Sequence, residues 1–423
     1  MNKLLLSICF LTLFLVACSP DRVNSAGEIE AACRVGIFES GENFLVLTRK
    51  GDGFRYMFDN GETGVVGDEK VVACIGNVVK TADFADMKAR TLRITNTHFV
   101  VDDVTLAGQL IEPEGANLKT TLIVYAHGSE ESGWLEQAID PYHMVARGMS
   151  VFVYDKRGTG LSEGNYTQNF PQLAKDLVAA SGEARRLAKD RFGRFGLFGL
   201  SQGGWIAPLA AEQAKADFIA VGYGLVVDIL EEDAAQVEME LLQSGYGTEV
   251  ISEAKKVTDL TALVATSGYT RGLEELDALR EKYRNAAWFS AIKGGFSGVI
   301  LNMSSEELRL NGIPMFDRLN IDWSLVPIDV LRNVKVPQLW VMAGEDQEAP
   351  IGKTIERLKT LRDEGLPIEI QVFPDTDHGM WEFNQRSDGS REYTKVTEGF
   401  YDLMADWAKN GQVNKTYGRS IEY

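Results

Sequence analysis

A serine set between two glycines is the feature of this chain best suited to chemistry. The stretch Gly199-Leu200-Ser201-Gln202-Gly203 follows an apolar run and precedes residues 205–211, which can begin a helix. A sharp strand-to-helix turn strains the backbone of its central residue, and side chains at the flanking glycine positions would clash with their neighbours. The pattern predicts that Ser201 is presented as a nucleophile, although a glycine-rich turn with a bystander serine shows the same five residues.

The residue after the serine would stand at the N-terminus of the helix. There the backbone N–H of Gln202 is free to donate a hydrogen bond, and the helix dipole favours negative charge. Both properties suit the stabilisation of an oxyanion during acyl transfer.

Serine needs a partner that accepts its proton, because it is a poor nucleophile at neutral pH. The chain contains four histidines. We expect His98 in a strand pair, His127 in a loop after a strand, and His143 inside a helix. Only His378 follows the serine in sequence and lies directly after an apolar strand. His378 is therefore the expected base.

A carboxylate must hold that base, and it should come from the end of the preceding strand. Asp346 is the favoured residue, with Glu345, Glu348 and Asp377 as competitors. Asp377 is adjacent to His378 in sequence, which is a poor position from which to reach Nδ1 of the imidazole. The sequence thus predicts a serine, acid, histidine order along the chain.

The segments around these residues alternate between strands and helices, which is typical of an α/β fold with a mostly parallel sheet. A pair of strands at 92–99 and 104–111 comes first. The expected strands are 120–126, 150–154, 195–198, 219–221, 338–342 and 368–373, and the expected helices are about 141–147, 173–192, 354–364 and 394–409.

Two regions fall outside this alternation. Residues 31–88 contain short β-prone runs separated by turn signals, which predict a small antiparallel β module. Residues 224–320 are helix-prone and interrupt the α/β domain, which we place at 89–223 and 321–412. We expect this insertion to form a cap over the sheet. Its aromatic residues suggest either an apolar acyl pocket or the cap's own core; they are Trp288, Phe289 and Phe296.

The N-terminus is predicted to be a targeting segment rather than part of the fold. Lys3 precedes an apolar run at residues 4–16, which is too short to span a bilayer. Leu15-Val16-Ala17-Cys18 resembles a bacterial lipoprotein signal, although an ordinary secretory peptide with a chance cysteine is the alternative. The resemblance implies a cleavage that exposes Cys18, a lipid on Cys18, a polar tether at 19–30 and a location in the cell envelope facing the periplasm. Ser19 is similar to the residue that directs such proteins to the outer membrane.

The cysteine content and the net charge bear on disulfide bonding, metal binding and the kinds of partner that the protein can have. Cys33 and Cys74 remain after the signal segment and can pair in an oxidising compartment, adding about 3–4 kcal/mol of stability. The cysteines and histidines have no spacing typical of a metal site, so no metal is expected. The net charge of −18 argues against nucleic-acid partners. Membrane contact is expected through the N-terminal lipid alone.

From about residue 92 to 410 the chain resembles the α/β-hydrolase superfamily, in its serine-aminopeptidase-like and esterase branch. The resemblance rests on the Ser201 turn, a His127-Gly128 loop, the order of the three expected catalytic residues, and the turn at 154–162, Tyr-Asp-Lys-Arg-Gly-Thr-Gly-Leu-Ser. It implies that the backbone N–H groups of Gln202 and Ser129 form the oxyanion hole. It also implies that no metal or organic cofactor is needed.

One position departs from the pattern of this superfamily. Asp346 lies two residues after Gly344, whereas many relatives place the acid three residues after the corresponding glycine. Gln347 fills that position here and cannot act as the acid. The departure bears on the identity of the acid and not on the existence of the triad.

The resulting hypothesis is a serine hydrolase that cleaves small-molecule carboxylic esters through an acyl-enzyme. An aminopeptidase-like amidase is the alternative, followed by a thioesterase and by a non-catalytic binding lipoprotein. An aminopeptidase needs a carboxylate for the substrate ammonium, and Glu231, Glu232 and Asp233 are the candidates. The charged turn Asp155-Lys156-Arg157 is a substrate-anion clamp or, as we favour, a local brace.

Overall fold

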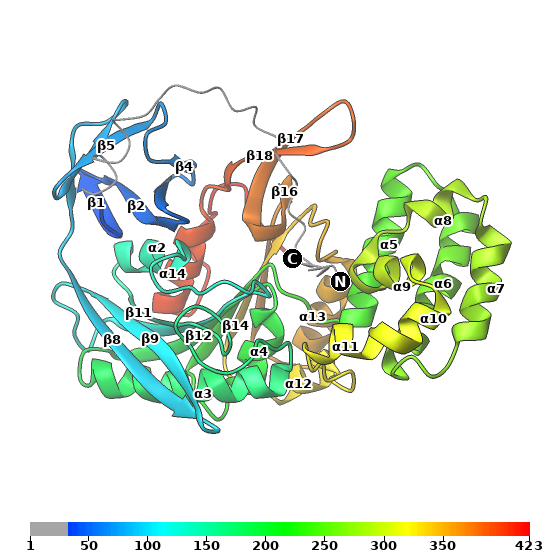
Figure 1. Cartoon of the computed structure of the whole chain (residues 1–423). Coiled ribbons are helices and arrows are strands. Elements are labelled where there is room, and N and C mark those ends of the chain that lie inside the picture. Colours follow the sequence, from blue (N-terminus) through cyan, green and yellow to red (C-terminus); the bar gives the residue numbers. More distant parts are fainter. Residues whose placement is uncertain (1–32) are drawn as a thin grey trace.

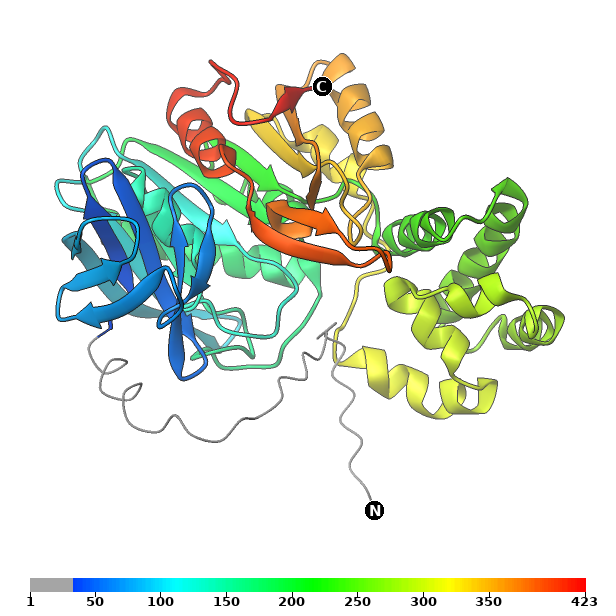
Figure 2. The same ribbon diagram turned by 90° about the horizontal axis from the view of Figure 1, so that it is seen from above.

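The computed structural model describes residues 33–423, so the expected signal segment, Cys18 and the tether at 19–30 lie outside the described residues. Three parts are visible in Figure 1: an N-terminal β module, a central sheet covered by helices, and a helical insertion. Figures 1 and 2 both place the β module and the helical insertion on opposite sides of the central sheet.

The central sheet has nine strands in the order β19-β15-β14-β13-β12-β10-β11-β9-β8. Neighbours from β11 through β15 run parallel, and the pairs β8–β9, β9–β11 and β15–β19 run antiparallel. The strands are β8 (Leu92–Val101), β9 (Val104–Pro113), β10 (Thr121–Ala126), β11 (Ser150–Tyr154), β12 (Arg194–Leu200), β13 (Phe218–Gly222), β14 (Gln338–Ala343), β15 (Ile368–Phe373) and β19 (Ile421–Glu422). The expected mostly parallel α/β sheet is confirmed.

Helices cover both faces of this sheet because its central strands are apolar on both sides. In β10, Leu122 and Val124 face one buried cluster, whereas Ile123 and Tyr125 face the other. Such alternation follows from the two-residue period of a strand. The first cluster is covered by α3 (Phe170–Ala188), α4 (Gly203–Ala210), α12 (Pro327–Asn333) and α13 (Gly352–Asp363), and the second by α2 (Asp140–Ala146) and α14 (Phe400–Asn410).

The N-terminal β module is a seven-stranded antiparallel sheet with two apolar faces. Phe38, Leu45 and Tyr56 form the module's own core, whereas Ile37 and Val46 belong to the cluster that also contains α2 and α14. The module is therefore packed onto the central sheet and its helices. Its strands are β1 (Gly36–Ser40), β2 (Asn43–Lys50), β3 (Gly53–Phe58), β4 (Thr63–Val65), β5 (Val71–Ile75), β6 (Val78–Thr81) and β7 (Met87–Ala89).

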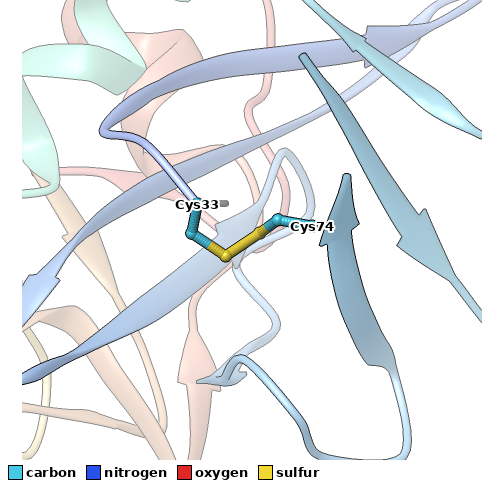
Figure 3. The surroundings of a disulfide bond; sticks show 2 residues. All are labelled: Cys33 and Cys74. Atoms are coloured by element: carbon cyan, nitrogen blue, oxygen red, sulfur yellow. A yellow bond between two sulfur atoms is a disulfide. The ribbon is translucent and has the colours of Figure 1, made fainter. Parts of the chain in front are cut away.

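A disulfide closes the start of this module. Cys33 and Cys74 are bonded to one another, with a Cα–Cα distance of 5.1 Å (Figure 3). The bond ties the segment before β1 to β5, which lies at the far edge of the module's sheet.

The insertion between β13 and α12 is helical, as expected. Its aromatic residues pack within the insertion, because Trp288 and Phe289 contact the ring of Tyr283 with centroid distances of 4.8 and 5.8 Å. Phe296 packs on Phe316, with a centroid distance of 5.5 Å. These residues are a core and not the acyl pocket that they also suggested. The helices are α5 (Ile229–Gln243), α6 (Thr248–Thr266), α7 (Leu273–Tyr283), α8 (Ala287–Ala291), η1 (Gly294–Gly298), α9 (Val299–Asn302), α10 (Ser305–Glu307), η2 (Leu308–Gly312) and α11 (Ile313–Asp317).

The expected helix at 394–409 is wrong at its start. Residues after β16 (Thr376–Asp377) form a hairpin of β17 (Trp381–Gln385) and β18 (Arg391–Val396), and α14 begins only at Phe400. Asp388 and Gly389 make the turn at the hairpin tip, with a φ of +84° at the glycine. An Asp-Gly pair between β-prone runs is a hairpin signal, so β17 and β18 could have been predicted from the sequence.

This hairpin joins the β module to the central sheet. The N–H of Val396 donates to the carbonyl of Gly61 at 3.1 Å, and the backbones of Lys395 and Glu62 form an isolated antiparallel β-bridge. Figure 2 shows the hairpin lying between the β module and the helical insertion. The chain after residue 412 also returns to the central sheet through β19, beyond the boundary expected for the domain. Among residues 33–423, no helix has the length and apolar character needed to cross a membrane.

Candidate active site

Ser201 stands at the end of β12, on a turn that only small neighbours permit. Its φ of +51° lies in the left-handed region, which strains a residue with a side chain. A Cβ added to Gly199 would lie 2.3 Å from the carbonyl oxygen of Gly203, and one added to Gly203 would lie 2.1 Å from that of Ala126. The two glycines are therefore required by close backbone approach.

The three residues expected to form a triad are brought together by the ends of three parallel strands. Ser201 follows β12, Asp346 follows β14, and His378 follows β15 and the short strand β16. Oγ of Ser201 lies 2.9 Å from Nε2 of His378, and Nδ1 of His378 lies 2.8 Å from Oδ2 of Asp346. This geometry allows proton transfer from the hydroxyl to an imidazole that a carboxylate orients.

The carboxylate of Asp346 is buried and fully hydrogen-bonded. Its Oδ1 accepts the backbone N–H of Glu348 at 3.0 Å and that of Ala349 at 2.7 Å, which leaves Oδ2 for His378. Burial alone lowers the pKa of His378, but the charge and hydrogen bond of Asp346 outweigh it and hold that pKa above the usual value. The ring of Tyr223 packs edge-on against the imidazole at 5.0 Å.

The competing carboxylates have other roles. Oδ1 of Asp377 accepts the N–H of Gln347 at 2.9 Å and that of His378 at 2.8 Å, and its Oδ2 lies 2.6 Å from Arg391. These donors hold the pKa of Asp377 below its usual value despite burial. Asp377 thus braces the two loops that carry the acid and the base. Glu345 pairs with Arg391 at 3.2 Å, and Glu348 is a largely exposed side chain 3.9 Å from Nε2 of His378.

The expected oxyanion donors lie on the loop after β10 and at the start of α4. A Cβ added to Gly128 would lie 3.6 Å from Cβ of Ser201, which places this loop beside the serine. Within residues 33–423, neither the backbone N–H of Ser129 nor that of Gln202 has a hydrogen-bond acceptor. Both are therefore able to donate to a substrate oxygen.

The charged turn after β11 is a brace and not an anion clamp. Asp155 accepts the backbone N–H groups of Trp134 and Leu135 at 2.6 and 3.0 Å. Lys156 is buried and donates to the carbonyl of Gly128 at 2.5 Å. Arg157 forms a two-point ion pair with the carboxylate of Asp176 at 2.6 and 2.7 Å.

The three acidic residues of α5 differ in their surroundings. Glu231 is paired with Arg357 at 2.7 Å, and Asp233 accepts the N–H of Phe296 at 2.7 Å. Among the described residues, the Glu232 side chain has neither a hydrogen bond nor an ion pair. Burial, followed by the charge of Glu348, raises the pKa of Glu232 well above its usual value. His378 and Asp346 also act on it, so Glu232 lies in the electrostatic field of the triad.

The other histidines are accounted for outside the triad. His127 pairs through Nδ1 with Glu130 at 2.6 Å and stacks on Trp134, and burial lowers its pKa. His143 lies in α2, stacks on Tyr401, and its pKa is lowered well below the usual value by burial. His98 lies in β8, as expected. In the part of the chain that the structure describes, no group of three or more His, Cys, Asp or Glu residues could hold a metal ion.

The sequence favoured the turn at 155–157 as a brace, but it did not predict the contact of Lys156 with Gly128, the role of Asp377 or the hairpin. Only the Asp-Gly pair at the hairpin tip was an available signal. The pairing of Lys156 with Gly128 joins residues 28 positions apart and depends on the order of neighbouring strands. A single charged turn carries no mark of that contact.

Comparisons with known proteins address part of the chain. A family model described as serine aminopeptidase, S33, matches residues 117–226 of the 423 residues. This segment contains Ser201 and the loop with Gly128. No curated protein matches the sequence.

Several solved structures are similar at low identity. An esterase of Pyrococcus furiosus is 16% identical, with a TM-score of 0.43, over 68% of this chain and 84% of that protein. The acylaminoacyl peptidase of Pyrococcus horikoshii is 16% identical, with a TM-score of 0.42, over 80% of this chain and 50% of that protein. A brefeldin A esterase, described as a bacterial homologue of human hormone-sensitive lipase, is 14% identical, with a TM-score of 0.42, over 69% of this chain and 70% of that protein.

The strand order supplies the fold assignment. Two antiparallel strands lead into a parallel sheet, the serine follows β12 on a strand-to-helix turn, and a helical insertion separates β13 from β14. The chain has the α/β-hydrolase fold, and over residues 117–226 it is similar to serine aminopeptidases.

Proposed function

We propose that this protein is a serine hydrolase that cleaves carboxylic acyl bonds through an acyl-enzyme, with small-molecule esters as the leading substrates. The observation that carries the proposal is the hydrogen-bonded series from Ser201 through His378 to Asp346, with distances of 2.9 and 2.8 Å. The two free N–H groups beside the serine add the electrostatic part of the same chemistry.

The residues divide the work as follows. Nε2 of His378 takes the proton of Ser201 while Oγ attacks the acyl carbon, and the carbonyl electron pair moves onto its oxygen. The N–H groups of Gln202 and Ser129 stabilise that oxyanion. The imidazolium then protonates the leaving alcohol. Water, deprotonated by His378, attacks the acyl-enzyme in the same way and releases the acid and the free serine. Asp346 keeps the imidazole oriented and stabilises its charge.

Active-site labelling tests this chemistry directly. A fluorophosphonate probe should modify the purified protein at Ser201, as read by mass spectrometry of the labelled peptide, because only an activated serine reacts readily. Labelling at another residue, or neither labelling nor ester turnover, contradicts the proposal. The second result would favour a non-catalytic binding protein on this fold.

The protonation of His378 predicts how activity depends on pH. Its imidazole must be neutral to accept a proton, and Asp346 holds its pKa above the usual value. The protonated, inactive form therefore predominates below that raised pKa. Plotted against pH, kcat/KM for an ester should fall as pH decreases through it, with a midpoint above that of a free imidazole, near 6.5.

An amidase that acts on aminoacyl groups is the second candidate, and Glu232 is the observation that favours it. A substrate ammonium beside this carboxyl would restore its charge and form an ion pair. Burial and the charge of Glu348 favour the neutral form of Glu232, so the anionic partner is not already present. This difference supports esters as the leading substrates.

Matched substrates separate the two candidates. We expect measurable hydrolysis of short-chain p-nitrophenyl esters and at least about tenfold lower kcat/KM on aminoacyl p-nitroanilides, a difference of ~1.4 kcal/mol in transition-state stabilisation. Any anilide activity should decrease in Glu232→Gln and persist in Glu231→Gln, because Glu231 is already paired with Arg357. Efficient anilide cleavage that Glu232→Gln abolishes would overturn the ester assignment.

The N-terminal segment supports an anchored location. Residues 1–18 have the charge, apolar run and terminal cysteine of a lipoprotein signal, so the enzyme is proposed to be held at the cell envelope, facing the periplasm, by a lipid on Cys18. Cys18→Ser should move the protein from the membrane fraction to the soluble fraction of the producing bacterium. A variant that still sediments with membranes in high salt contradicts the anchor, and Cys9→Ser is the matched control.

A further inference from the structure

We propose that Lys156 is a positioning residue that aims the oxyanion donor of Ser129 at the substrate, without touching the substrate itself. The inference rests on the proposed function and adds a component to its oxyanion hole. It is carried by the contact between the Lys156 ammonium and the carbonyl oxygen of Gly128.

The geometry of one peptide unit connects the two groups. The carbonyl of Gly128 and the N–H of Ser129 belong to the same planar, trans peptide, since the described residues contain no cis peptide bond. In such a unit the C=O and N–H point in opposite directions. The ammonium of Lys156 holds the carbonyl at 2.5 Å, on the buried side of the loop. The N–H of Ser129 is thereby directed away from Lys156.

A second contact restricts the next peptide of the same loop. The hydroxyl of Tyr166 donates to the carbonyl of Ser129, and its ring lies 5.1 Å from the Lys156 ammonium. Both carbonyls of the loop are therefore held from the side of residues 156–166. A Cβ added to Gly128 would lie 2.7 Å from Oε2 of Glu130 and 3.6 Å from Cβ of Ser201, so this glycine lies beside the serine.

The charge of Lys156 also strengthens the donor. A cation on the carbonyl oxygen polarises the peptide and makes its N–H more positive. Such an ammonium is costly to bury without partners, and Lys156 is only 2% exposed. Within residues 33–423 its one hydrogen bond is to Gly128. An apolar side chain could fill the same buried space without this cost. The ammonium on the Gly128 carbonyl is therefore better explained by an effect on that peptide than by packing.

Several titratable groups surround Lys156. Burial lowers its pKa to about 8, and the charges of Glu130 and Glu131 oppose that shift. Glu130 is itself paired with His127, and Glu131 with Arg318. Tyr166 faces the ammonium as a neutral ring, and the neighbouring Asp155 carboxylate is occupied by backbone N–H groups. Deprotonation of Lys156 above about pH 8 would remove the charge and weaken the hold on Gly128.

The test compares Lys156→Met and Lys156→Arg with wild type and with Lys175→Met, an exposed lysine on α3. With p-nitrophenyl acetate, Lys156→Met should reduce kcat by about 10- to 100-fold and change KM less than about threefold, because an oxyanion donor acts in the transition state. An alkyl trifluoromethyl ketone supplies a second readout. It adds Ser201 Oγ at its carbonyl carbon, passes the serine proton to His378 and places O⁻ in the oxyanion hole, so its affinity should fall in parallel with kcat.

The pH profile distinguishes positioning from mere support of the loop. Both enzymes share the rise in activity that deprotonation of His378 produces, so the readout is the ratio of the wild-type kcat to that of Lys156→Arg. This ratio should decline above about pH 8, because the arginine guanidinium stays charged whereas the Lys156 ammonium loses its proton. A merely structural lysine predicts parallel losses in melting temperature and a kcat ratio that does not change with pH.

The outcomes are distinct from those of the proposed function. If wild type takes the fluorophosphonate label at Ser201 and Lys156→Met retains wild-type kcat and ketone affinity, the inference alone is wrong. If Lys156→Met fails to fold, the comparison of wild type with Lys156→Arg still decides. A kcat ratio of these two enzymes that stays constant from pH 7 to 9.5, with unchanged circular dichroism, overturns the role of Lys156.

Discussion

Replacing Ser201 by alanine should lower kcat on p-nitrophenyl esters by about 10⁴-fold or more and abolish fluorophosphonate labelling. The reason is that the hydroxyl is the proposed nucleophile, and among residues 33–423 it is the hydroxyl that is hydrogen-bonded to Nε2 of His378, at 2.9 Å. Residual activity should come only from substrate binding and the oxyanion donors.

The folded state should tolerate this change well. Alanine removes one hydroxyl from a partly exposed position and keeps the backbone turn, so the melting temperature should move by only a few degrees. A variant that folds normally and still hydrolyses esters at more than a thousandth of the wild-type rate would show that another nucleophile is present.

Replacing Asp346 by asparagine should slow turnover by about 10³- to 10⁴-fold. The amide can keep the hydrogen bonds from the N–H groups of Glu348 and Ala349, but it cannot stabilise a charged His378. It also presents an N–H where the imidazole requires an acceptor, which leaves the ring in the wrong tautomer. Steady-state kinetics across pH should show the loss in kcat, together with a lower pKa on the acid limb.

Asp377→Asn is the matched control for this experiment. An asparagine oxygen can still accept the N–H groups of Gln347 and His378, so kcat should fall by less than about tenfold. The lost charge leaves Arg391 without its buried partner, and the free energy of unfolding should decrease by about 3 kcal/mol or more. A reversal of the two kinetic effects would move the catalytic acid from Asp346 to Asp377.

Much of the fold was predictable because the signals are local. Continuous apolar runs such as residues 121–126 are typical of parallel strands, and the glycines around Ser201 report a turn that larger residues cannot make. The position of His378 after an apolar strand likewise suggested where it would lie. Since the carboxyl ends of parallel strands meet at one edge of a sheet, three such positions are enough to predict a common site.

What could not be predicted depends on contacts between distant segments. The sequence favoured Asp346 over Glu348 and Asp377, but which of the three faces Nδ1 of His378 depends on how the loops pack. The aromatic residues of the insertion were equally consistent with a pocket or a core. The packing of Trp288 on Tyr283 and of Phe296 on Phe316 distinguishes the two.

The packing of the β module was also beyond local reasoning. Alternation along β1 and β2 predicts two faces, but one of them packs on α2 and α14, which are encoded far downstream. The sequence pattern predicts that a face is apolar, but it does not predict which elements pack against that face.

The triad joins residues that are far apart in the chain: 177 positions separate Ser201 from His378. During synthesis, Ser201 and the entire helical insertion emerge before His378 does. The imidazole is held in place only after β15 has paired with β14 and the hairpin of β17 and β18 has formed. A nascent or truncated chain thus carries an inert serine. The proposed hydrolytic activity therefore requires the last strands of the sheet to form, so an active-site label at Ser201 would report the completion of folding.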